Sequence, residues 1–143
     1  MRLLIAILSL ISFGVFSQSD APVKFELTEL NDTLHLKANI DNGWHLYAVH
    51  LPNPFDGPLP TEISIDSDDV KISGDIAEDE GIREEDAAFG VEVIFFEHEA
   101  NFYIPFEKVN KLSEYHFTVN VAYMVCNDES CRPYDAAIKT VLK

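Results

Sequence analysis

The chain has 143 residues, of which 47% are hydrophobic and 24% charged, and its 25 acidic and 10 basic residues give a formal net charge of −15. This length fits a single domain of ordinary apolar content, and the acidity argues against nucleic-acid binding and against docking on anionic lipid, which both need a basic surface. The two cysteines are too few for a disulfide-built scaffold or for a zinc site made of cysteines alone.

The first residues have the pattern of a secretory signal peptide. A short basic start precedes an almost unbroken apolar run over residues 3–13, which is too short to span a membrane. Val15 and Ser17 are small enough for the −3 and −1 positions of a cleavage site. We therefore predict that residues 1–17 are removed and that residues 18–143 form an exported, soluble domain, with no later segment that could cross a membrane.

Apolar and polar residues alternate over short segments, which is the pattern of half-buried strands. The predicted strands cover residues 23–29, 34–40, 44–49, 62–65, 70–72, 91–96, 102–106, 115–123 and 137–142. The four prolines between residues 52 and 60 predict a rigid, irregular loop. Eight or nine short strands, with no segment of helical periodicity, indicate an all-β protein built as an antiparallel β-sandwich.

An acidic segment lies in the middle of the chain. Ten of the 21 residues from Asp66 to Asp86 are acidic, against Lys71 and Arg83. Such a run is usually a solvated loop or the edge of a sheet. It can also be an electrostatic face that selects a binding partner, and the sequence leaves both interpretations open.

The two cysteines follow the most regular predicted strand. The polar residues between Cys126 and Cys131, Asn127 to Ser130, favour a turn that brings the two sulfurs within bonding distance. In an oxidising compartment, which the signal peptide implies, we expect the two cysteines to pair.

The spacing does not decide whether this disulfide is a structural staple or a redox centre. A bond between residues this close in sequence stabilises a fold by roughly 2 kcal/mol in the loop-entropy model, near the low end for disulfides. A short ring across an exposed turn is also easy to reach and to reduce. Asp128 and Glu129 inside the ring disfavour a thiolate, whereas the neighbouring Arg132 favours one.

Three stretches occur in a characteristic order: Asp-Asn-Gly-Trp-His-Leu-Tyr at 41–47, Asp-Ala-Ala-Phe-Gly at 86–90 before an aromatic strand, and the cysteine pair followed by Pro133-Tyr134. Together they resemble the N-terminal periplasmic domain of the thiol:disulfide interchange protein DsbD. The resemblance extends over residues 22–142.

The resemblance implies an immunoglobulin-like β-sandwich whose active disulfide is Cys126–Cys131, with Cys131 meeting the partner and Cys126 resolving the mixed disulfide. It further implies that Phe89 is the aromatic tip of a cap loop that shields the disulfide and that Tyr47 packs beside the cysteines. His45 stands where the family often has a second tyrosine. The Cys-x4-Cys spacing is one residue tighter than in the best-known members.

The resemblance also implies partners and a compartment. Domains of this family take electrons from the membrane part of the transporter and pass them to periplasmic thioredoxin-fold proteins, such as those serving cytochrome c maturation or disulfide isomerisation. The present chain ends after this domain, so we expect a membrane electron transporter to supply its electrons in trans.

These observations lead to two hypotheses. In the first, the protein is a periplasmic thiol:disulfide oxidoreductase of the protein-disulfide reductase type, which needs no cofactor. In the alternative, it is a non-enzymatic Ig-like binding module in which Cys126–Cys131 is a structural disulfide and the acidic residues 66–86 bind a partner. The five histidines lack the spacing of a blue-copper site, so we predict no metal centre.

Overall fold

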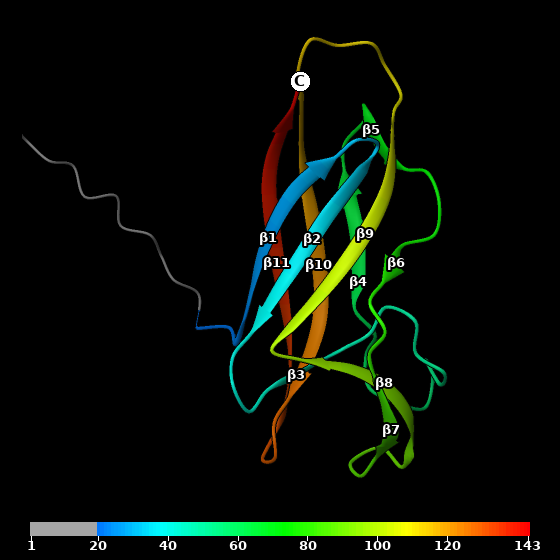
Figure 1. Cartoon of the computed structure of the whole chain (residues 1–143), viewed down its shortest axis with the longest axis vertical. Coiled ribbons are helices and arrows are strands. Elements are labelled where there is room, and N and C mark those ends of the chain that lie inside the picture. Colours follow the sequence, from blue (N-terminus) through cyan, green and yellow to red (C-terminus); the bar gives the residue numbers. More distant parts are fainter. Residues whose placement is uncertain (1–19) are drawn as a thin grey trace, which may run out of the picture.

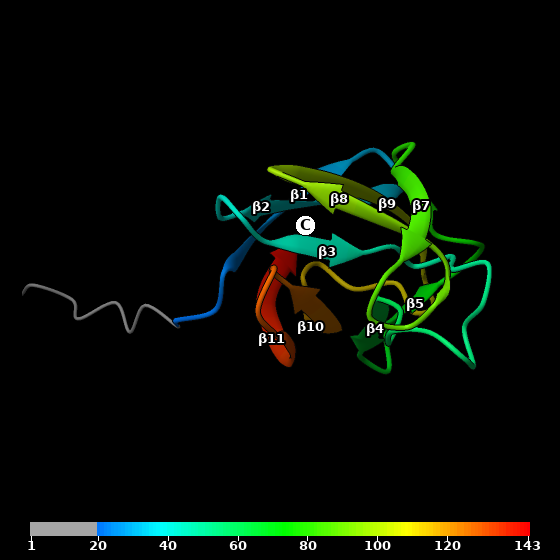
Figure 2. The same ribbon diagram turned by 90° about the horizontal axis from the view of Figure 1, so that it is seen from below.

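The computed structural model describes residues 20–143, and the signal peptide predicted over residues 1–17 lies outside them. All regular elements of this described part are β-strands, arranged in two antiparallel sheets that pack as two layers (Figures 1 and 2). Within the same part, no helix is long and apolar enough to span a membrane. The all-β sandwich prediction is confirmed.

The first sheet is built around a hairpin of β1 (Val23–Leu30) and β2 (Thr33–Ile40). β9 (Glu99–Lys108) pairs with β2, and the short strands β5 (Val70–Ile72) and β6 (Ala77–Glu78) pair with β9. Every second residue of β2 is buried, which is the alternation that predicted the strand.

The second sheet carries the cysteines. Its strands, in spatial order, are β11 (Cys131–Leu142), β10 (Tyr115–Cys126), β3 (His45–Tyr47), β8 (Val91–Glu97) and β7 (Ile82–Asp86), while β4 (Glu62–Asp66) also pairs with β10. β3, β7, β8 and the turn between β10 and β11 all lie at one end of the long axis, far from the C-terminus (Figure 1).

The strand pleat gives this end of the second sheet two different faces. Val125, Leu46 and Phe96 are register partners on β10, β3 and β8, and all three are buried. The Phe96 ring meets Phe102 of the first sheet edge-to-face at a centroid distance of 6.0 Å, so this face belongs to the sandwich core. Because side chains alternate along strands, the intervening residues project from the opposite, outer face.

The described residues form eleven strands rather than the eight or nine expected. The two unforeseen strands, β6 and β7, lie within the acidic segment 66–86. β7 has the sequence IREED and pairs with β8 over its whole length, although four of its five residues are exposed. An edge strand needs only a backbone partner, so its sequence does not have to alternate between apolar and polar residues. The alternation pattern therefore could not predict β7.

Two other boundaries also differ from the predictions. The break expected at residues 97–101 is the single residue His98, whose φ of 65° lies in the left-handed region. The last strand begins at Cys131 rather than at residue 137, because β10 and β11 pair along their full length up to the cysteines.

Gly81 leads into β7 at a point where the chain lies very close to β8. A Cβ added there would lie 2.6 Å from Ile94 Cγ2 and 2.9 Å from the Phe95 carbonyl oxygen. We predict that Gly81→Ala lowers the free energy of unfolding by about 1–3 kcal/mol, measured by urea titration. At the control position Gly74, the nearest atom would lie 3.4 Å from the new Cβ, so Gly74→Ala should change stability by less than about 0.5 kcal/mol. Equal losses in the two variants would contradict the prediction.

Candidate functional site

Cys126 and Cys131 form a disulfide at the end of the β10–β11 hairpin. The Asn127 N–H donates to the Ser130 carbonyl at 2.9 Å, which makes these two residues a hydrogen-bonded pair. The next pair along the ladder is therefore a non-hydrogen-bonded one, the type in which the Cα atoms lie closer. Cys126 and Cys131 are this pair, with Cα atoms 4.0 Å apart, so the strand register itself brings the sulfurs together.

The side chain of Asn127 fixes the turn between the cysteines. Its Oδ1 accepts hydrogen bonds from the backbone N–H groups of Glu129 at 2.9 Å and of Ser130 at 2.8 Å. Asparagine commonly stabilises tight turns in this way. The turn expected from the polar residues 127–130 is thus present.

The two halves of the disulfide differ in their access to solvent. Cys126 is 2% exposed, whereas Cys131 is an exposed residue. Both line a hollow of about 400 Å³ on the outer face of the second sheet. A molecule that approaches from solvent therefore meets Cys131 first.

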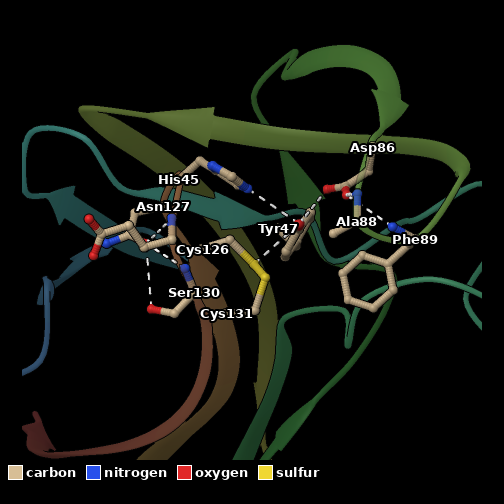
Figure 3. The surroundings of a disulfide bond; sticks show 10 residues. His45, Tyr47, Asp86, Ala88, Phe89, Cys126, Asn127, Ser130 and Cys131 are labelled. Carbon is tan, nitrogen blue, oxygen red and sulfur yellow. Dashed lines mark hydrogen bonds between the residues drawn. A yellow bond between two sulfur atoms is a disulfide. The ribbon is translucent and has the colours of Figure 1, made fainter.

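The Tyr47 hydroxyl lies at the centre of the site (Figure 3). Its oxygen is 2.6 Å from Asp86 Oδ2, 3.4 Å from Cys126 Sγ and 3.3 Å from His45 Nε2. A phenol has one proton, and the short contact to a carboxylate makes Asp86 its acceptor in the disulfide form. Burial of this side chain, together with its bond to Asp86, raises the pKa of Tyr47 far above its ordinary value.

Asp86 connects Tyr47 with the turn between β7 and β8, residues 86–90, which we call the cap turn. Asp86 Oδ1 accepts hydrogen bonds from the backbone N–H groups of Ala88 at 2.8 Å and Phe89 at 3.3 Å. Sequence reasoning included Asp86 in the cap loop but did not single it out as a site residue. An aspartate that opens a turn closed by Gly90 was the available signal.

His45 is the register partner of Cys126 on one side and of Glu97 on the other. It is half-buried, and its ring centroid lies 4.7 Å from that of Phe95. Burial lowers the pKa of His45, and this effect is larger than that of four nearby carboxylates, which raise the pKa. In order of effect, these are Asp86, Glu97, Glu84 and Asp128.

Four of the five predicted site residues meet around the hollow: Cys126, Cys131, Tyr47 and His45. Phe89 is half-buried in the cap turn, but the residues of that turn that line the hollow with the disulfide are Asp86, Ala87 and Ala88. Figure 3 shows the Phe89 ring at the side of the site. Its role as a shield remains a prediction.

Comparisons with known proteins show the family and the fold of this chain. The family model described as "Thiol:disulfide interchange protein DsbD, N-terminal" matches residues 14–143, while no curated protein matches the chain. The chain is similar to the crystal structure of the Neisseria meningitidis DsbD N-terminal domain in the reduced form, with a TM-score of 0.62 and 20% identity over 83% of this chain and 84% of that one. The family expectation and the fold expectation are both confirmed.

A second solved structure has the same fold. It is the complex between the DsbD N-terminal and PilB N-terminal domains from Neisseria meningitidis, with a TM-score of 0.61 and 16% identity over 88% of each chain. At this level of identity, the likeness establishes the fold of the present chain.

We predict that Tyr47→Phe lowers the free energy of unfolding at pH 7 by about 2 kcal/mol, because Asp86 loses a short hydrogen bond. The wild-type protein should also lose stability as the pH rises above about 10, where Tyr47 ionises in the unfolded chain but stays protonated in the fold. Tyr47→Phe should make this alkaline loss shallower. Urea titrations between pH 7 and pH 11 measure both effects.

Tyr103→Phe is the matched control, because Tyr103 is exposed on β9. Equal stability losses for the two substitutions, or an unchanged alkaline slope in Tyr47→Phe, would contradict the role assigned to the Tyr47 hydroxyl.

Proposed function

Because this chain belongs to the family of DsbD N-terminal domains, we propose that it is a periplasmic thiol:disulfide exchange domain. It relays reducing equivalents to thioredoxin-fold partner proteins through Cys126 and Cys131, and a membrane transporter supplies the electrons in trans. The mature domain comprises residues 18–143 and reaches the periplasm through the signal peptide predicted over residues 1–17.

The observation that carries this proposal is the unequal exposure of the two cysteines beside a hollow. Cys131 is exposed, whereas Cys126 is 2% exposed and lies 3.4 Å from the Tyr47 hydroxyl. Thiol–disulfide exchange needs direct contact between the attacking sulfur and one sulfur of the bond. The unequal exposure therefore selects Cys131 as the sulfur that a partner attacks.

The exchange proceeds in two steps. The partner thiolate forms a bond to Cys131 Sγ, the Cys126–Cys131 bond breaks, and its electron pair moves to Cys126 Sγ. A second thiolate of the partner then attacks the partner sulfur of this mixed disulfide, which releases Cys131 as a thiolate and leaves the partner as a disulfide. In the electron-donating direction the steps reverse: the Cys131 thiolate attacks a partner disulfide, and Cys126 then attacks Cys131 Sγ and releases the reduced partner. Cys126 is thus the leaving thiolate when the domain accepts electrons and the resolving cysteine when it donates them.

Charge restricts which partners react. Glu84, Glu97 and Asp128 are exposed residues that line the hollow. Their negative charge disfavours free thiolates at this site and repels an acidic partner. Exchange with an undocked thiol is therefore slow. Exchange is faster with a docked partner whose own cysteine is surrounded by neutral or basic residues.

The Neisseria meningitidis complex supports a protein partner, since a DsbD N-terminal domain there binds another protein domain, that of PilB. The alternative, a binding module stapled by its disulfide, needs Cys126–Cys131 only for stability. The two hypotheses differ in what happens when one cysteine is removed.

A thioredoxin that retains only its attacking cysteine, carried as a mixed disulfide with thionitrobenzoate, provides the test. We predict that Cys126→Ser, which leaves Cys131 free, forms an intermolecular disulfide with it at least about tenfold faster than Cys131→Ser, because the remaining thiol is accessible. Release of the coloured thionitrobenzoate and the appearance of the cross-linked species on a non-reducing gel measure the rate. Equally slow reactions, with the free energy of unfolding lowered in both variants, would favour the structural staple.

We propose that Phe89 shields the disulfide by holding the cap turn closed, because its half-buried ring anchors the turn that carries Ala87 and Ala88. Phe89→Ala should therefore speed reduction of Cys126–Cys131 by dithiothreitol several-fold. Phe55→Ala makes the same truncation at a side chain that is 96% exposed in the proline-rich loop, and it should leave the rate unchanged. An unchanged rate in Phe89→Ala would remove Phe89 from the shielding role.

A further inference from the structure

His45 is connected to the buried sulfur through a single hydroxyl group. Its Nε2 lies 3.3 Å from the Tyr47 oxygen, and that oxygen lies 3.4 Å from Cys126 Sγ. Cys126 and His45 are also direct register partners, so their side chains project from the same face of the sheet. A change of charge on Cys126 therefore changes the electrostatic potential at the His45 ring.

Carboxylates of four residues face His45 from the elements around it: Glu84 and Asp86 on β7, Glu97 on β8, and Asp128 in the β10–β11 turn. The Tyr47 hydroxyl, on the same strand as His45, is a neutral neighbour. Burial nevertheless lowers the pKa of His45 in the disulfide form, so the imidazole is neutral at pH 7. One more negative charge beside the ring would act with these carboxylates and against the effect of burial.

Reduction of the disulfide supplies that charge. When a thiolate bonds to Cys131 Sγ, the electron pair of the broken bond stays on Cys126 Sγ, which is almost fully buried. A buried anion needs a compensating charge or a proton. The Asp86 carboxylate adds to the negative potential at this sulfur. It accepts a hydrogen bond from the Tyr47 hydroxyl, which itself lies against Cys126 Sγ.

We propose that His45 couples reduction of the disulfide to the uptake of one proton. As the Cys126 thiolate forms, a proton from solvent converts His45 to imidazolium, its Nε2–H donates to the Tyr47 oxygen, and the Tyr47 proton turns from Asp86 toward Cys126 Sγ. The thiolate and the imidazolium cancel in charge, and the proton is released when the disulfide re-forms. His45 is a positioning residue, because it acts on the sulfur through Tyr47. The inference rests on the proposed function only in that the disulfide is reduced.

The coupling is measured by titrating the histidine ring signals by NMR in the disulfide form and in the form reduced with dithiothreitol. We expect the pKa of His45 to rise by at least about one pH unit on reduction, as a new adjacent negative charge requires. By linkage, the Cys126 thiol must become correspondingly more acidic when His45 is present. The thiolate absorbance of Cys131→Ser, with and without His45→Gln, reports this second effect.

His35 is the internal control. It lies on β2 in the other sheet, is half-buried like His45, and its Nε2 is 2.8 Å from Asn101 Oδ1. Its ring NMR signals, recorded at one fixed pH, should be the same in both redox forms. A merely structural role for His45 predicts no change at either histidine, and an unchanged or lowered pKa of His45 would overturn the inference.

The outcomes separate this inference from the proposed function. A disulfide that dithiothreitol reduces, with an unmoved pKa at His45, overturns the proton coupling alone. A moved pKa without exchange with the single-cysteine thioredoxin overturns the relay function and leaves the coupling standing. A disulfide that resists dithiothreitol overturns both.

Discussion

The Asp86 carboxylate holds the candidate site together, because its two oxygens bind different parts of it. Oδ1 accepts hydrogen bonds from backbone N–H groups of the cap turn, and Oδ2 accepts the Tyr47 hydroxyl, which in turn lies against Cys126 Sγ. The conformation of the cap turn and the hydrogen bonding around the buried sulfur are thereby linked through one side chain. A change in one of them acts on the other through this carboxylate.

The position of Asp86 depends on β7, which has few apolar residues of its own. This strand is held by its backbone ladder with β8 and by the close approach at Gly81. Edge strands with exposed, charged side chains have low local stability. Such a strand suits the carrier of a cap turn, because none of its residues belongs to the buried core.

Four of the five residues expected beside the disulfide gather around the hollow, whereas the neighbouring strand β7 was not foreseen. Alternation identified β2 and β10, whose buried faces are continuous, and the turn residues 127–130 placed the two cysteines opposite each other. β7 could not be found in this way, because pairing with β8 and not burial makes it a strand. The same reason hid the part played by Asp86, which acts through strand pairing with β8 and through contacts to Tyr47, 39 residues earlier in the chain.

The placement of the disulfide separates redox chemistry from stability. Cys126 and Cys131 close a hairpin whose strands already pair along their full length, so the bond adds little to the free energy of the fold. Since the bond lies at the end of the ladder, we expect its opening to change mainly the charge on one buried sulfur. Carboxylates surround that sulfur, so the energetic cost of reduction is set by how its new charge is compensated. A neighbouring histidine and a docked partner can each supply this compensation.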